Sequence, residues 1–243
     1  MTQARPDDRF VRGVFTSVAR RYDLMNDLMS GGVHRCWKDA MVRRLDPRPG
    51  ERILDVAGGT GDVAFRIRDR LRVSGTGGAR GEVVVCDATE AMLRVGRDRG
   101  VDSGRVDGLR WLGGDAQALP LPDGCVDAYT IAFGLRNVTD IDAALREAWR
   151  VLRPGGRLLC LEFSQVAVPG FDRLYAAYSD AVLPRLGAAV AGDRASYRYL
   201  VDSIRRFPDR HQLAARMRAA GLASVRHTTF MGGIAALHRA RRP

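Results

Sequence analysis

The chain has 243 residues, of which 46% are hydrophobic and 28% are charged, a balance typical of globular proteins. Its length allows one large domain with a substantial core, and we expect a single domain over residues 1–243. No apolar run approaches the roughly 20 residues of a membrane span, and residues 1–12 are too polar for a secretory signal. We therefore expect a cytoplasmic protein rather than a membrane-spanning or secreted one.

The formal net charge is +11, and nearly every positive side chain is an arginine because Lys38 is the only lysine. This charge fits a solvated surface, and it also fits an anionic partner such as nucleic acid or a membrane surface. The four cysteines show no Cys-x-x-Cys spacing, so we expect no metal site and interpret them as reduced thiols in the core. They are Cys36, Cys86, Cys125 and Cys160.

Residues 8–46 carry helical spacing without strand patterns, which predicts a helical preface. Short apolar runs then alternate with helical patterns, and the runs predict strands at 52–56, 82–86, 109–112, 128–132 and 157–162. Helices are expected at 60–71, 90–99 and 142–152, the last of them ended by Pro154-Gly155-Gly156. This alternation indicates an α/β fold, a doubly wound and mostly parallel sheet with helices on both faces.

After residue 162 the alternation stops, and residues 165–208 are predicted to form a helical insertion that caps the sheet. One stretch is amphipathic, because the apolar side chains of Phe171, Tyr175, Tyr178 and Val182 share a helical face. The end of the chain predicts helices at 197–206 and 211–220 and two closing strands at 223–228 and 233–238. The insertion therefore precedes the last two of seven strands, where it can cover the ligand edge.

A glycine-rich turn joins the first predicted strand to the helix after it. Its glycines, Gly58, Gly59 and Gly61, let a ligand approach bare backbone, and the N–H groups of the helix point at that ligand. The turn lacks the lysine of a P-loop and the third glycine of a dinucleotide fingerprint. Asp55, at the end of the strand, places a carboxylate beside these N–H groups. This arrangement favours a ligand with a zwitterionic end, which carries a positive and a negative charge. The alternative is a purely structural turn.

The pattern Asp-x-x-x-Gly-x-Gly from Asp55 to Gly61 resembles motif I of the class I methyltransferases, which bind S-adenosylmethionine. Asp87 ends the second strand, where a carboxylate can accept hydrogen bonds from the ribose or, alternatively, cap a helix that contains Glu90. Gly-Asp-Ala at Asp115 resembles the adenine-contacting turn of these enzymes, and a plain tight turn is the alternative. The resemblance implies cofactor contacts from Asp55, Gly58, Gly59, Thr60, Gly61, Asp87, Ala88, Asp115, Ala116 and Ala132.

Longer motifs resemble one family, the ubiquinone/menaquinone C-methyltransferases, from about residue 15 to residue 238. They are the stretches 22–38, 133–139, 150–156 with 161–164, 198–208 and 233–238. The resemblance implies a Rossmann-like class I fold, S-adenosylmethionine as cofactor, and methylation of a ring carbon of a polyprenylated benzoquinol or naphthoquinol. It also suggests that Tyr22, Met25 and Asn26 cap the cofactor or, alternatively, fix the preface to the core. Ala132 departs from the family, which usually has a serine there.

Carbon methylation requires a phenol that is activated by loss of its proton, beside a methyl group held in line. The family's proposed catalytic residue corresponds to Arg136, which we expect to stabilise the phenolate because arginine is a poor base. Asn137 would support it. His34 is the alternative base, since an imidazole titrates near pH 6.5, and a packed structural histidine is the competing interpretation.

Other functions remain open at this point. Another small aromatic substrate is the nearest alternative, and a scaffolding subunit of a quinone-synthesis assembly is the non-enzymatic one. Nucleic acid is not expected, because the motif of base amino-methyltransferases is missing after the fourth strand, where Ala132 to Leu135 stand. The insertion is expected to line a prenyl-tail channel or to touch a membrane surface, with plain core packing as the alternative. A peripheral contact with the inner membrane and a homodimer are also expectations.

Overall fold

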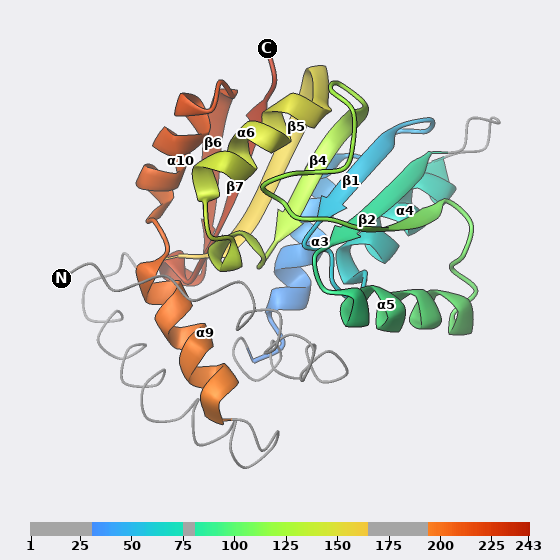
Figure 1. The fold of residues 1–243 in the computed structure, drawn as a ribbon, viewed down its shortest axis with the longest axis horizontal. Helices are drawn as coiled ribbons and strands as arrows, with labels where there is room; N and C mark the ends of the chain where they lie inside the picture. The colour runs from blue at the N-terminus through green and yellow to red at the C-terminus, as the bar shows by residue number, and fades with distance from the viewer. Residues whose placement is uncertain (1–30, 75–80, 165–193) are drawn as a thin grey trace.

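The computed structural model describes residues 31–74, 81–164 and 194–243 (Figure 1). Three predicted cofactor contacts, Tyr22, Met25 and Asn26, lie outside these residues. The same is true of most of the predicted insertion, with Phe171, Tyr175, Tyr178 and Val182, and of the preface before residue 31. Among the helices of the described ranges, none combines the length and the apolar character needed to cross a bilayer.

A seven-stranded sheet with the order β3-β2-β1-β4-β5-β7-β6 forms the centre of the molecule. β7 runs antiparallel to β5 and β6, and the other neighbours are parallel. The predicted doubly wound, mostly parallel sheet is therefore confirmed. The strands are β1 (Arg52–Val56), β2 (Glu82–Asp87), β3 (Leu109–Gly113), β4 (Val126–Ala132), β5 (Leu152–Phe163), β6 (Ala223–Phe230) and β7 (Ala235–Arg241).

Helices cover both faces of the sheet (Figure 1). α3 (His34–Leu45) and α4 (Asp62–Ser74) pack on one face, and α6 (Ile141–Val151) and α10 (Arg210–Ala219) on the other. α5 (Glu90–Asp102) contacts β2 and β3. The central strands are consequently buried on both sides, which explains why their sequences are continuous apolar runs rather than alternating patterns.

The carboxyl ends of β1, β2 and β4 are flanked by shorter elements. The 3-10 turn η2 (Leu135–Asn137) follows β4, and α9 (Arg194–Arg206) contacts it beyond the edge of the sheet (Figure 1). A second 3-10 turn, η3 (Met231–Gly233), connects β6 to β7. The predicted helix at 197–206 is thus part of α9, and it lies where a cap over this edge is expected.

Several predicted boundaries are shifted: the strand predicted at 128–132 begins at Val126, the one predicted at 233–238 is Ala235–Arg241, and the largest error is at the start of β5. β5 begins at Leu152, not at residue 157, and α6 ends at Val151, so that Pro154-Gly155-Gly156 lies inside the strand. Val126 pairs with Leu152 and Ala128 with Arg157, so the segment forms an irregularity in the β4–β5 ladder. Gly155 has φ +77° there, a conformation that favours glycine.

The cysteine interpretation is only partly correct. All four thiols are free, and Cys86 and Cys160 lie buried in the sheet, but Cys36 is exposed and Cys125 is half-buried. Burial raises the pKa of Cys86 to about 12, so this thiol stays protonated. Cys36 directly precedes the buried Trp37 in α3, so its side chain lies on a different side of the helix and faces outward.

Candidate active site

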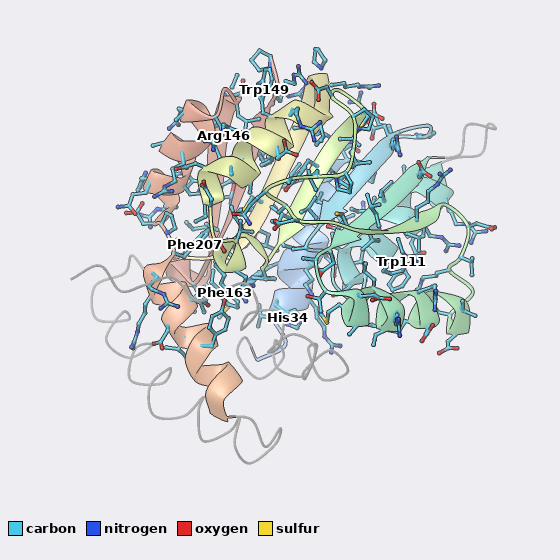
Figure 2. The ribbon with its side chains drawn as sticks, viewed as in Figure 1. His34, Trp111, Arg146, Trp149, Phe163 and Phe207 are labelled. Carbon is cyan, nitrogen blue, oxygen red and sulfur yellow. The ribbon has the colours of Figure 1, made fainter. Side chains whose placement is uncertain are left out.

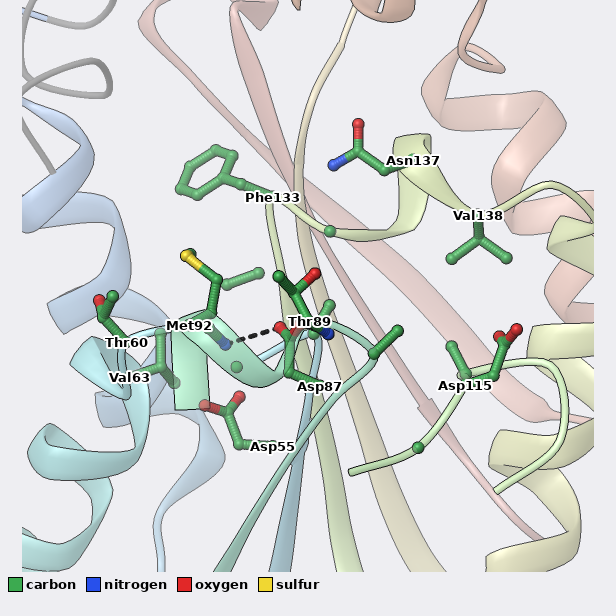
Figure 3. A pocket seen from close by; sticks show the side chains of 18 of the residues that line it. Asp55, Thr60, Val63, Asp87, Thr89, Met92, Asp115, Phe133, Asn137 and Val138 are labelled. Carbon is green, nitrogen blue, oxygen red and sulfur yellow. Dashed lines mark hydrogen bonds between the residues drawn. The ribbon is translucent and has the colours of Figure 1, made fainter. Parts of the chain in front are cut away.

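A cavity of about 1050 Å³, including the open space at its mouth, lies at the carboxyl ends of β1, β2 and β4 (Figure 3). β1 lies between β2 and β4, at the point where the strand order reverses. Ligands of open parallel sheets bind at this topological switch point. Most of the predicted cofactor contacts line the cavity: Asp55, Gly58, Gly59, Thr60, Asp87, Ala88, Asp115, Ala116 and Ala132.

The loops after β1 and β4 approach each other closely at the cavity. A Cβ on Gly134 would collide with the Cβ of Ala57, so only glycine fits there. Ala57 and Phe133 have φ values of +49° and +57°, which are strained for residues with a side chain. Both residues line the cavity, so the strain is located where the ligand is expected. Gly61 does not line the cavity; its position, with φ +81°, packs against Trp111.

Asp55 is buried at the end of β1, with 1% of its surface exposed. Its Oδ1 accepts a hydrogen bond of 2.7 Å from the hydroxyl of Thr130, whereas Oδ2 has no partner within the described residues. Burial raises its pKa to about 7, although the hydroxyl of Thr130 and the charge of Lys38 act in the opposite direction. A Cβ on Gly58 would lie 3.0 Å from Oδ2, so any larger residue at this position would crowd the oxygen.

Asp87 joins the end of β2 to the glycine turn. Its Oδ2 accepts a hydrogen bond of 2.9 Å from the N–H of Gly59, and its Oδ1 accepts one of 2.8 Å from the N–H of Thr89 (Figure 3). The N-cap of α5 is Thr89, so the alternative that Asp87 caps the helix containing Glu90 is wrong. The carboxylate is fixed by backbone donors and points along the cavity wall.

Asp115 lies in a tight turn, and this turn lines the cavity, so the position fits both the predicted adenine contact and the alternative of a plain turn. Its Oδ1 accepts hydrogen bonds from the N–H and the side-chain amide of Gln117, at 2.9 and 3.1 Å. The oxygen of the same Gln117 amide, Oε1, accepts a hydrogen bond of 2.8 Å from the N–H of Asp140. The turn is therefore held in place by α6, and Asp115 and Ala116 form the far wall of the cavity.

Sequence reasoning missed an ion pair in the cavity wall. The ammonium of Lys38 donates to Oδ2 of Asp62 at 2.8 Å, and both residues line the cavity. Burial raises the pKa of Asp62, but the charges of Lys38 and Arg66 outweigh it and lower the pKa to about 2. The sequence contained one signal for this site, since Lys38 is the only lysine of the chain.

The predicted catalytic loop follows β4 as η2. Asn137 lines the cavity and accepts a hydrogen bond of 3.2 Å from the hydroxyl of Tyr199 in α9. Arg136 lies beside the cavity without lining it, with 1% of its side chain exposed. Its Nη1 donates to Oε1 of Glu162 at 2.7 Å, and its own N–H donates to Oε2 at 3.3 Å. A buried ion pair thus joins the loop to the end of β5.

His34 occupies the first position of α3 and is buried, with 1% of its surface exposed (Figure 2). It does not line the cavity. Neither candidate for phenol activation, Arg136 or His34, therefore lines the cavity, and Asn137 is the predicted catalytic residue that does.

Comparisons with known proteins bear on the whole chain. Residues 1–242 match the family described as the ubiE/COQ5 methyltransferase family. The protein named ubiquinone/menaquinone biosynthesis C-methyltransferase UbiE from Methylobacterium nodulans is 58% identical over 233 residues, covering 94% of this chain and 88% of the relative. The protein of the same name from Paracoccus denitrificans is 57% identical over 228 residues, with coverage of 94% and 88%.

Solved structures share the fold at low identity. A SAM-dependent methyltransferase from Thermotoga maritima has a TM-score of 0.65 at 18% identity, covering 96% of this chain and 100% of that one. The [4+2]-cyclase SpnF has a TM-score of 0.70 at 17% identity, with coverage of 99% and 97%. The predicted class I methyltransferase fold is therefore confirmed, and the family match and the close relatives agree. The chain belongs to the ubiE/COQ5 methyltransferase family.

Proposed function

We propose that the protein is an S-adenosylmethionine-dependent C-methyltransferase that methylates a ring carbon of a polyprenylated quinol in ubiquinone and menaquinone biosynthesis. Family membership and relatives at 57% and 58% identity named for this role support the reaction class. The observation that carries the assignment of the site is the cavity at the switch point, where Asp55 lies near the end of β1, Asp87 ends β2 and Asp115 follows β3.

The residues of the cavity fit this cofactor. Oδ2 of Asp55 is a buried acceptor without a partner among the described residues, and it suits the ammonium of the methionine end. Asp87 holds the ribose hydroxyls, while Asp115 and Ala116 contact the adenine. Four aspartates line the cavity, Asp62 among them, and this negative field favours a ligand with a sulfonium and an ammonium. When bound, the cofactor supplies an electrophilic methyl group.

The loop after β4 prepares the quinol. Asn137 faces the cavity and donates or accepts at the phenol oxygen, and Tyr199 fixes its orientation. Arg136 stabilises the phenolate, which increases the electron density on the ring carbon. Glu162 balances the charge of Arg136, so the effect on the phenol is that of a buried dipole rather than an isolated cation. His34 is the alternative proton acceptor.

The substrate dissolves in membranes, so we also propose that the protein works at the inner membrane surface, alone, as a homodimer or in a quinone-synthesis assembly. Mass spectrometry of the quinones in a strain lacking this protein tests the function. We expect ubiquinone or menaquinone precursors that lack one ring methyl group, and the identity of the precursor distinguishes benzoquinol from naphthoquinol. A normal quinone profile, or accumulation of a different aromatic compound, would refute the assignment.

Replacing Asp87 by alanine should weaken binding of S-adenosylmethionine by about 1–3 kcal/mol, because charged hydrogen bonds to the ribose are lost. The variant also loses the bond from Gly59, which holds the glycine turn. Titration calorimetry measures the effect, and Glu90→Ala is the matched control, since Glu90 is an exposed carboxylate that pairs with Arg94. Unchanged affinity in folded Asp87→Ala would remove Asp87 from the cofactor site.

Cofactor affinity should depend on pH through Asp55. Its pKa of about 7 means that the carboxyl is protonated below this pH, so binding of a cationic cofactor beside it releases a proton. We expect affinity for S-adenosylmethionine to increase as the pH rises towards 7 and to level off above it. Asp55→Asn keeps an acceptor for Thr130 and should remove the pH dependence. A wild-type affinity that is constant from acid to neutral pH would contradict this role.

The raised pKa of Asp55 also makes folding stability depend on pH, and stability falls as the pH rises, whereas cofactor affinity increases. The folded-state pKa of Asp55 is raised from its ordinary value of 3.8 to about 7, so the folded chain retains a proton that the unfolded chain loses. This contribution to stability is fully present below pH 3.8 and is lost as the pH rises through 7. Asp55→Asn should therefore stabilise the ligand-free protein at neutral pH more than at acid pH.

A further inference from the structure

Lys38 is exceptional in composition and in position. It is the only lysine among the 39 lysine and arginine residues of the chain. It is also one of the most buried basic side chains, with 4% of its surface exposed, and it reaches the cavity from α3. A lysine offers a compact ammonium on a flexible stem, whereas an arginine carries a wide planar fork. A chain that uses arginine everywhere else has lysine where a cation must fit into a cavity wall.

The ammonium of Lys38 has capacity for a second partner. An ammonium carries three donors, and within the described part of the chain its one hydrogen bond goes to Asp62, at 2.8 Å. The aromatic ring of Phe133, also in the cavity wall, lies 6.0 Å away. Donors that are not used by Asp62 are available to a ligand in the cavity.

Asp62 does not depend on Lys38 alone for a positive partner. The other oxygen of that carboxylate accepts a hydrogen bond of 3.1 Å from Nε of Arg66, and Arg66 also pairs with Asp39. Asp62 is therefore compensated from two sides. Among the described residues that line the cavity, Lys38 is the only cation, and it stands against four aspartates.

We propose that Lys38 binds the carboxylate at the methionine end of the cofactor. Asp62 holds the side-chain ammonium of Lys38 in position for this contact. The proposal rests on the proposed function for the identity of the cofactor. It assigns the two ends of the amino acid to opposite partners, since Asp55 suits its ammonium and Lys38 its carboxylate. Asp55 lies at the end of β1, before the glycine turn, and Lys38 reaches the cavity from α3 to pair with Asp62, the first residue of α4.

The test compares two ligands that differ only at this end. S-adenosylhomocysteine carries the amino acid, and methylthioadenosine lacks it but keeps the adenosine and the sulfur. Titration calorimetry is done with each ligand on the wild type, on Lys38→Met and on Lys38→Gln, which keeps a donor for Asp62. We expect both variants to bind S-adenosylhomocysteine about tenfold to a hundredfold more weakly, the loss typical of a charged hydrogen bond, and methylthioadenosine with unchanged affinity.

Arg66→Met is the matched control. Arg66 is the second cation that pairs with Asp62, but unlike Lys38 it does not line the cavity. It should leave both affinities unchanged. Equal weakening of both ligands in the Lys38 variants would mean that Lys38 only ties α3 to α4, and would overturn the proposal, as would no weakening of either. A decarboxylated S-adenosylhomocysteine that still responds to Lys38→Gln would also overturn it, since Lys38 would then recognise another group.

The experiment separates this proposal from the proposed function, because it involves no quinol. A wild type that binds S-adenosylhomocysteine through Lys38 but methylates no quinol would refute the substrate assignment alone. A wild type that methylates quinols while the Lys38 variants bind both ligands normally would refute the Lys38 subsite alone.

Discussion

Replacing Arg136 by alanine is expected to lower the free energy of unfolding by about 3–5 kcal/mol, because it leaves a buried carboxylate without its cation. Glu162 is 1% exposed and, among the described residues, would keep hydrogen bonds from backbone N–H groups alone, such as the one of 2.8 Å from Phe163. Burial already raises the pKa of Glu162 while Arg136 is present. Chemical denaturation at neutral pH measures the loss.

Turnover in Arg136→Ala should fall by about 10²–10³-fold in kcat, the size typical of one electrostatic donor, with little change in cofactor affinity. Arg136→Lys keeps the charge and should retain partial activity. The double variant Arg136→Met with Glu162→Gln separates folding from chemistry, because it buries no charge in this position. It should recover most of the stability and remain as inactive as Arg136→Ala. Near-normal turnover in either folded variant would show that another residue activates the phenol.

His34→Ala distinguishes the two candidates for that activation. If His34 is the base, its removal should abolish the rise of kcat with pH near neutrality, which is the region where an imidazole titrates. If Arg136 stabilises the phenolate, the rise persists in His34→Ala. The measurement requires saturating cofactor, because Asp55 titrates in the same range and affects cofactor binding.

Gly134→Ala is expected to lose cofactor binding and to destabilise the fold by about 1–3 kcal/mol or more, the range for overpacking. The added Cβ collides with the Cβ of Ala57, which is attached directly to the backbone, so the loops after β1 and β4 must separate. Both loops line the cavity. The backbone of Gly134, with φ −115° and ψ −31°, accepts alanine without strain, so the effect isolates the collision.

Ala57→Gly provides the rescue for this variant. It removes the colliding Cβ, and at φ +49° glycine is also less strained than alanine. We expect Gly134→Ala with Ala57→Gly to recover the stability and cofactor affinity that Gly134→Ala loses, as measured by thermal unfolding and calorimetry. If the double variant is as impaired as the single one, the close approach of the two loops is not what Gly134 provides.

Features of the fold that depend on residues adjacent in sequence could be predicted from the sequence. The run Arg52 to Val56 is apolar and ends at a glycine turn, and β1 has those bounds. The start of β5 was missed because Pro154-Gly155-Gly156 has the composition of a break. Only pairing with Val126, in the neighbouring strand, makes Leu152 part of the sheet.

The residues of the candidate site also fall into those that could be predicted from local sequence and those that could not. Asp55, Asp87 and Asp115 were predicted because each lies at or just after the end of a strand, and parallel strands bring their carboxyl ends to one edge. Lys38 and Glu162 were not predicted, because their roles arise from contacts between elements distant in sequence. Lys38 meets Asp62 only when α3 docks beside α4, and Glu162 meets Arg136 because β5 lies next to β4.

Methyl transfer by the purified protein tests the proposed function most directly. The protein is incubated with a reduced polyprenyl quinol that lacks one ring methyl group and with S-adenosylmethionine labelled in its methyl group, and the product is analysed by mass spectrometry and magnetic resonance. We predict that the label appears on a ring carbon, with one S-adenosylhomocysteine formed for each quinol methylated. A label on a phenol oxygen, or no transfer by protein that binds the cofactor, would contradict the assignment.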